Sequence, residues 1–175
     1  MTRFVGLLVV VLLAAAGGAA VVSAEPEWYL RLRYPLEYEH IVRGHAANYE
    51  LDPALLAAVI YQESKFDPNA QSDSGAIGLM QLLPETAKGI AARTGGSEFH
   101  VRDLRNPEIN IRYGSWYLRH LLDKYGSEHK ALAAYNGGQG NVDRGVVYRE
   151  TEHYVDRVLE LRGIYRDAYA SELGY

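Results

Sequence analysis

A single glutamate, Glu63, combines a residue type and a spacing that could support acid catalysis. Leu56, Val59, Ile60 and Glu63 follow the i, i+3, i+4 spacing that places side chains on one face of a helix. The carboxyl would then continue an apolar stripe, where lost hydration raises its pKa and favours the protonated form. Cleavage of a glycosidic bond near neutral pH needs such an acid. The alternative is an ordinary glutamate that turns into solvent or pairs with Arg or Lys.

Other catalytic chemistries find no support in the sequence. It contains no His-Glu-x-x-His zinc motif, no phosphate-binding loop and no Gly-x-Ser-x-Gly elbow. It also has no cysteine, which excludes disulfides, a thiol nucleophile and a Cys-ligated metal. His40 and His45 are five positions apart, a spacing that does not bring two ligands onto one helical face. We therefore expect no metal and no cofactor, and we expect both histidines to lie on the surface.

The helix that carries Glu63 has clear start and stop signals. Asp52 is a good N-cap and Pro53 suits the first helical position, so a helix is predicted from there to about Phe66. Residues 72–75 have turn chemistry, and residues 75–81 form a loop with two glycines three positions apart. Those glycines allow the backbone to approach a neighbouring group closely. The loop is therefore expected to pack tightly beside the helix.

The remaining helices are predicted from proline, glycine and apolar spacing. No segment shows sustained period-two alternation, so the fold is predicted to be all-α. The last helix is expected to be capped by Thr151. The other predicted helices cover residues 38–48, 84–94, 107–125 and 128–135.

The N-terminal segment, residues 1–24, is an apolar targeting segment. Arg3 precedes an uncharged run over residues 4–24, and residues 22–24 offer a small-residue cleavage site for a signal peptide. The run is also long enough to span a bilayer, with Trp28 and Tyr29 at interfacial depth. We favour an uncleaved membrane anchor over a cleaved signal peptide. Either outcome places the remaining chain outside the cytoplasm.

Length and composition favour one globular domain. The chain has 175 residues, of which residues 25–37 are interpreted as a connector and residues 38–170 as the functional domain. A hydrophobic content of 48% is enough to form a packed core. The net charge of −4, without a long Lys/Arg run, argues against nucleic acid as a partner. We expect a monomer.

Four sequence motifs together resemble the soluble lytic transglycosylase family, whose fold is shared with goose-type lysozymes. They occur in the family's order across residues 38–165. The resemblance implies a lysozyme-like helical domain with a long substrate groove, preceded here by the N-terminal hydrophobic segment. The motifs are Glu63-Ser64-Lys65-Phe66; Gly78-Leu79-Met80-Gln81-Leu82 with Pro84, Thr86 and Ala87; Ala131-Leu132-Ala133-Ala134-Tyr135-Asn136; and Glu150-Thr151 with Tyr154-Val155.

The resemblance also implies a reaction and a set of site residues. The family cleaves the β-1,4 bond between N-acetylmuramic acid and N-acetylglucosamine in peptidoglycan, without water, and leaves 1,6-anhydro ends. Glu63 is implied to be the only acid/base, with no metal and no cofactor. Peptidoglycan glycan strands are the implied partner. The implied substrate-binding residues are Ser64, Met80, Gln81, Tyr135, Asn136 and Tyr154.

Two alternatives to this function remain open, and one loop departs from the family. A hydrolytic muramidase could use the same scaffold, and a peptidoglycan-binding envelope module could use it without catalysis. The family commonly has Ala-Gly-Pro-Gly after its Tyr-Asn pair, whereas residues 137–140 here read Gly-Gly-Gln-Gly. Loss of the proline is predicted to loosen that loop.

Overall fold

The computed structural model describes residues 26–96 and 98–175, which belong to two units divided after Pro35. In the first unit, α2 (Glu27–Arg33) is a short helix in which Arg31 pairs with Glu27 at 2.9 Å, one helical turn apart. The interpretation of residues 25–37 as a plain connector therefore misses a helix. The predicted anchor or signal peptide lies outside the described residues. In the described part of the chain, no helix has the length and apolar character that a membrane crossing requires.

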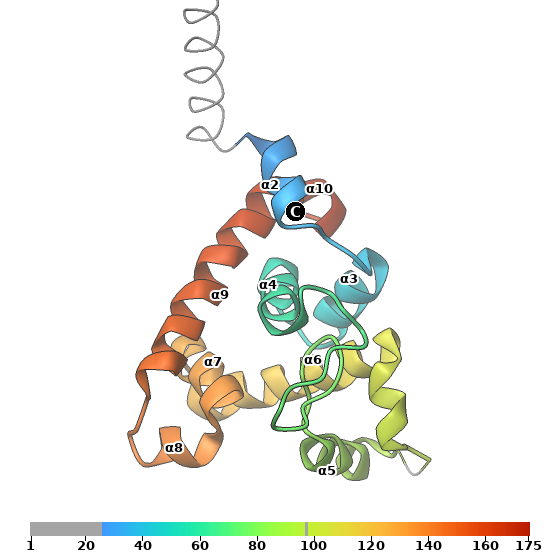
Figure 1. Cartoon of the computed structure of the whole chain (residues 1–175), viewed down its shortest axis with the longest axis vertical. Helices are drawn as coiled ribbons and strands as arrows, with labels where there is room; N and C mark the ends of the chain where they lie inside the picture. The colour runs from blue at the N-terminus through green and yellow to red at the C-terminus, as the bar shows by residue number, and fades with distance from the viewer. Residues whose placement is uncertain (1–25, 97) are drawn as a thin grey trace, which may run out of the picture. The chain divides into compact units, whose positions relative to one another are not determined.

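The second unit, Leu36–Tyr175, is built of helices, as Figure 1 shows. The all-α prediction is confirmed, because the described residues contain no strand and only isolated bridges near the loop at residues 71–82. The helices are α3 (Glu39–Asn48), α4 (Pro53–Ser64), α5 (Pro84–Thr94), η1 (Val101–Arg105), α6 (Pro107–Tyr125), α7 (Glu128–Gly137), α8 (Gln139–Asp143), α9 (Arg149–Ala168) and α10 (Ala170–Leu173).

Helix α4 lies among the other helices of this unit, packed against α9 and α3 (Figure 1). It begins as predicted, because the Asp52 carboxylate accepts hydrogen bonds from the N–H groups of Ala54 and Leu55. Every residue from Ala54 to Ile60 is buried. The helix is thus enclosed on all sides, whereas the sequence analysis expected a single buried stripe. A helix that is apolar all round belongs in the core of a domain.

The start of α9 differs from the prediction. Thr151 does not cap the helix, which begins at Arg149 after Tyr148. The Thr151 side chain is buried, and its hydroxyl donates to Asn136 Oδ1 at 3.1 Å. Because the helix begins two residues before Thr151, this residue lies within the first turn and not at the position from which a side chain caps the helix.

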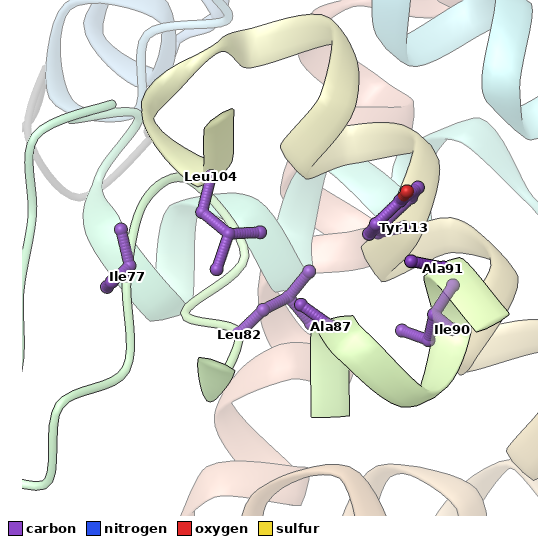
Figure 2. Close-up of a cluster of buried hydrophobic side chains, with 7 residues drawn as sticks. All are labelled: Ile77, Leu82, Ala87, Ile90, Ala91, Leu104 and Tyr113. Atoms are coloured by element: carbon purple, nitrogen blue, oxygen red, sulfur yellow. The ribbon is translucent and has the colours of Figure 1, made fainter. Parts of the chain in front are cut away.

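An apolar cluster holds the 77–82 loop against α5, η1 and α6. Figure 2 shows its side chains, with Leu82 next to Ala87 at the start of α5. The loop is therefore fixed by core packing at both of its ends, which is what the tight-loop expectation required. The cluster consists of Ile77, Leu82, Ala87, Ile90, Ala91, Leu104 and Tyr113.

One histidine contradicts the expectation of a surface position. His45 is only 6% exposed, and its Nε2 lies 2.8 Å from a carboxylate oxygen of Glu108 on α6. Its ring also stacks on Tyr49. His40 is exposed, as expected. The acid on a neighbouring helix is what permits the polar ring to be buried, and it is not visible from local spacing.

Candidate active site

Glu63 stands in the last turn of α4, where that helix meets a cleft. The helix ends because Lys65 and Phe66 both adopt positive φ angles, 52° and 65°. The chain then turns into the loop that forms the cleft wall. The cleft has a volume of about 350 Å³, and Glu63 keeps part of its surface open to it. Burial raises the pKa of the Glu63 carboxyl to about 7, against a smaller lowering by a hydrogen bond from Tyr154.

Tyr154 of α9 is the direct partner of the carboxyl. Its hydroxyl donates a hydrogen bond of 2.7 Å to Glu63 Oε1. Burial and the nearby Glu63 charge raise the pKa of Tyr154 well above its ordinary value of 10. The phenol therefore stays protonated at neutral pH and remains a donor. The structure thus brings together two of the residues that the sequence analysis singled out.

Tyr135 of α7 lies close to Glu63 but bonds a different group. Its hydroxyl donates to the main-chain oxygen of Met80 at 2.8 Å. Burial, followed by the charge of Glu63, raises the pKa of Tyr135 well above its ordinary value. The Tyr135 ring packs against Tyr117 with centroids 5.4 Å apart. Tyr135 therefore ties α7 to the cleft loop and flanks the acid without bonding it.

Asn110 on α6 also holds the loop at residues 77–82 through hydrogen bonds. The sequence analysis did not predict a role for this residue. Its Oδ1 accepts from the Met80 N–H at 2.7 Å, and its Nδ2 donates to the oxygens of Ile77 and Leu104 at 2.9 and 2.8 Å. Asn110 has no exposed surface. Its position beside Ile111 on the buried face of a helix was the available signal. A buried amide must satisfy its hydrogen bonds, and Asn110 does so with two groups of the loop and one of η1.

Gly78 is required for this close approach. Its φ is 79°, and a Cβ at this position would lie 2.3 Å from Leu104 O and 2.4 Å from Asn110 Nδ2. Both values are far shorter than a normal contact, so a side chain would push the loop off α6. The predicted role of the loop glycines in close backbone approach therefore holds at Gly78.

The predicted groove residue Met80 does not line the cleft with its side chain. Met80 is fully buried, and it packs so closely on α6 that a Cβ at Gly114 would lie 2.2 Å from its Sδ. The side chain fills the core beneath the loop, and only the main chain serves the site. Thioether side chains often fill such gaps.

Ser64 and Gln81 also make bonds within the protein. The Ser64 hydroxyl donates to Leu79 O at 2.8 Å and Ile60 O at 3.2 Å, which joins α4 to the loop. Gln81 Nε2 donates to Gly78 O at 2.8 Å and Ala70 O at 3.2 Å. Gln81 borders the cleft, whereas Ser64 is not among its lining residues. A role in sugar binding therefore stays a prediction for both.

Two serines that the sequence analysis passed over as turn residues also face the cleft. Ser72 and Ser74 line it, and their hydroxyl oxygens lie 2.9 Å apart. Small hydroxyl side chains on a loop beside an apolar helix end were the available signal. The other lining residues are Glu63, Ala76, Gln81, Leu82, Leu83, Thr86, Tyr117, Tyr135, Asn136 and Gly138. In this lining, which is taken from the described part of the chain, Glu63 is the only carboxylate.

The segment after Asn136 is held by side-chain hydrogen bonds, and the predicted loosening by loss of the proline stays a prediction. Residues 139–143 form α8, where a loop was expected. Lys124 Nζ donates to Gln139 Oε1 at 2.9 Å and to Asp143 Oδ2 at 2.8 Å. The Tyr125 hydroxyl donates to Asp143 Oδ1 at 2.8 Å. Gln139, at the position of the family's proline, is thus anchored by a cation on α6.

No metal centre is indicated in the part of the chain that the structure describes. Among residues 26–96 and 98–175, no three His, Cys, Asp or Glu side chains gather where they could hold an ion. The chemistry available to the cleft is therefore that of one partly buried carboxyl with hydroxyl and amide neighbours. Such a group can donate a proton near neutral pH and accept it again.

The helical domain places one acid at the end of a buried helix, facing a cleft, which agrees with the lysozyme-like fold that the resemblance implied. Comparison with known proteins then gives the family. The chain matches the transglycosylase SLT domain over residues 40–155 and belongs to this family.

Individual relatives agree with the family match. The transglycosylase of Enterobacteria phage PRD1 is 36% identical over 125 residues, covering 71% of this chain and 43% of the phage protein. Membrane-bound lytic murein transglycosylase C of Actinobacillus pleuropneumoniae is 36% identical over 135 residues, covering 71% of this chain and 37% of that protein. This chain therefore corresponds to less than half the length of these relatives.

Solved structures of lytic transglycosylases share the fold. Slt from Pseudomonas aeruginosa, solved as an inactive variant with one glutamate changed to glutamine, gives a TM-score of 0.76 at 29% identity. That match covers 87% of this chain and 28% of Slt. The 70-kDa soluble lytic transglycosylase of Escherichia coli gives 0.74 at 29% identity, covering 79% of this chain and 25% of that enzyme. The expected lysozyme-like helical fold is confirmed.

Proposed function

We propose that this protein is a peptidoglycan lytic transglycosylase in which Glu63 is the single acid/base. The observation that carries the proposal is a carboxyl with a pKa of about 7 beside a cleft whose described lining holds no second carboxylate. Most glycosidases need two carboxylates, one as acid and one as base or nucleophile. A site with one carboxyl suits a reaction in which the substrate supplies the second function. The relatives named above are transglycosylases by description, which supports the same class.

The proposed reaction uses the carboxyl of Glu63 twice, first as an acid and then as a base. Protonated Glu63 first donates to the glycosidic oxygen, and the bond from the muramyl C1 to that oxygen breaks. The N-acetyl oxygen of the same sugar stabilises the electron-poor C1. The Glu63 carboxylate then takes the proton of the muramyl C6 hydroxyl, whose oxygen attacks C1 and closes the 1,6-anhydro ring. No water is consumed, and Glu63 ends in its starting protonation state.

The protein groups around Glu63 have matching proposed roles. Tyr154 holds one carboxylate oxygen, which leaves the other oxygen to exchange the proton with substrate. Gln81, Asn136, Ser72 and Ser74 offer hydroxyl and amide groups to the sugar from the cleft walls. We propose that the site works on glycan strands outside the cytoplasm, where peptidoglycan lies.

Product analysis tests the proposal. Purified peptidoglycan digested with the protein should release muropeptides with 1,6-anhydro ends, which borohydride cannot reduce and which mass spectrometry identifies by the missing water. Reducible ends would instead indicate a hydrolytic muramidase, and an undigested substrate would indicate a binding module. Glu63→Gln should lower turnover by ~10²–10⁴-fold or more. Glu98→Gln, which removes an exposed carboxylate away from the cleft lining, is the matched control.

A further inference from the structure

A second hollow, which we call the side hollow, adjoins the cleft and is not used by the proposed reaction. Its volume is about 210 Å³, and it lies between α5, α6 and α8. Thr86 and Tyr117 line both the side hollow and the cleft, so the two share a wall. The other residues that line it are Glu85, Gly89, Ile90, Arg93, Trp116, His120 and Gln139.

Among the charged groups that line the side hollow, Arg93 is a cation that can bind an anionic ligand. Its one acid, Glu85, pairs with Lys88 at 2.7 Å. Arg93 donates from Nη1 to Gly89 O at 2.8 Å, and in the described part of the chain it has no carboxylate partner. Arg93 is exposed, so its remaining N–H groups face solvent. An exposed guanidinium without an acid is a ready site for an anion.

The aromatic wall of the side hollow is shaped differently from a sugar-stacking platform. The Trp116 indole and the His120 imidazole are stacked, with centroids 5.3 Å apart and planes within 10°. One face of the indole is therefore covered by protein. Trp116 also packs against the apolar cluster shown in Figure 2. The wall can exclude water from one side of a small anionic ligand, while the Arg93 guanidinium forms an ion pair with the negative charge of the ligand.

We propose that the side hollow binds a free carboxylate of the peptide stem that peptidoglycan carries on the lactyl group of muramic acid. The proposal rests on the proposed function, because it needs a glycan strand in the adjoining cleft. A stem leaving that strand is covalently tied to the substrate, so it reaches the side hollow at a high effective concentration. Strands without stems keep only the lactyl carboxylate of muramic acid, which stays close to the sugar ring and cannot extend toward Arg93 as a stem does. The fork of a guanidinium fits a carboxylate in a bidentate manner.

The test compares two substrates and two arginine variants. Steady-state rates are measured on glycan strands that carry stems and on strands from which an amidase has removed them. Arg93→Gln should raise KM on the stem-bearing strands by about 5-fold, and so reduce the preference of the wild type for them. Arg93→Lys should keep part of the preference, because it retains the charge without the fork. Arg102→Gln removes another exposed charge, outside the side hollow, and should leave the preference unchanged.

Three outcomes would overturn the proposal. They are a preference that survives Arg93→Gln, an equal loss on both substrates, and a wild type without preference. Binding of a synthetic stem peptide, followed by NMR of the Trp116 indole N–H in wild type and Arg93→Gln, separates this inference from the proposed function. A shift seen only in the wild type supports the side hollow even if no strand is cleaved. No shift in the wild type contradicts the side hollow even if cleavage is normal.

Discussion

The Tyr154 hydroxyl donates to Glu63 Oε1 across 2.7 Å, joining two residues that stand 91 positions apart in the chain. The pKa of the carboxyl is set by this bond and by burial acting in opposite directions. Burial raises it and the bond lowers it, with burial the larger effect, so that it stands at about 7. The contact between α4 and α9 therefore both orients the carboxyl and adjusts its acidity.

Tyr154→Phe should separate these two effects. Removal of the hydroxyl takes away the influence that lowers the pKa of Glu63, so this pKa should rise further. Because the general acid works in its protonated form, the alkaline limb of the pH profile of kcat/KM should move to higher pH. The looser carboxyl should lower kcat by about 10-fold. Tyr49→Phe, whose hydroxyl is away from the cleft lining, serves as control. An alkaline limb that stays in place would contradict this account.

Glu63→Gln should change how the free energy of unfolding depends on pH. The carboxyl has an ordinary pKa of 4.5 when unfolded and about 7 when folded, so the folded state holds more protons between these values. The contribution of the Glu63 carboxyl to the wild-type free energy of unfolding should therefore decrease by about 3 kcal/mol as pH rises from about 4.5 to 7. The variant lacks the titration, so its stability relative to wild type should grow over that window. Urea unfolding at several pH values measures the difference, and a flat difference would refute the prediction.

Asn110 variants should show whether its three hydrogen bonds hold the cleft loop. Asn110→Ala leaves the Met80 N–H and two carbonyl oxygens without their partner, and it should cost about 3 kcal/mol of unfolding free energy. Asn110→Asp keeps the acceptor for Met80 but sets a carboxylate oxygen against two carbonyl oxygens. It should therefore be less stable at neutral pH than at acid pH. Asn48→Ala, at an exposed position at the end of α3, should cost far less. Equal losses at positions 48 and 110 would contradict the role of Asn110.

Tyr135→Phe should weaken the site without shifting its pH dependence. The hydroxyl bonds Met80 O and not Glu63, so its loss frees the loop while the Tyr154 bond to the acid stays in place. Turnover should fall by up to about 10-fold, and stability by about 1 kcal/mol. The alkaline limb of the pH profile should stay where it is in the wild type. A shift as large as that of Tyr154→Phe would mean that Tyr135 acts on the carboxyl directly.

Local signals predicted the helices well where a neighbouring side chain accepts the hydrogen bonds of the first-turn N–H groups. Asp52 with Pro53 and Asn106 with Pro107 begin helices as expected, because each side chain accepts hydrogen bonds from its own first turn. Gly126 ends α6 with φ at 59°. The raised pKa of Glu63 also agrees with the prediction, although α4 is enclosed on all sides and not along one stripe. Local spacing therefore predicted the helix that carries Glu63 and the direction in which the pKa of its carboxyl is shifted.

Features that depend on distant partners escaped sequence reasoning. Thr151 has a good capping side chain, but α9 begins two residues earlier, and the Thr151 hydroxyl donates to Asn136 on another helix. The Met80 side chain enters the core because Gly114 leaves room for it on α6. His45 is buried because Glu108 meets it from 63 positions away. In each case the deciding atom belongs to a residue that no local window contains.

The burial of α4 also determines which parts of the site can open without global unfolding. Residues Ala54 to Ile60 have almost no exposed surface, so their amide protons can exchange with solvent only when the surrounding core opens. Their exchange should report the same free energy as global unfolding. The proposed acid is thus carried by a helix whose preceding residues are buried, while Ser72, Ser74 and Asn136 lie on more exposed segments. Local opening of the domain should therefore expose these segments of the cleft wall before it reaches the backbone of α4 that carries the proposed acid.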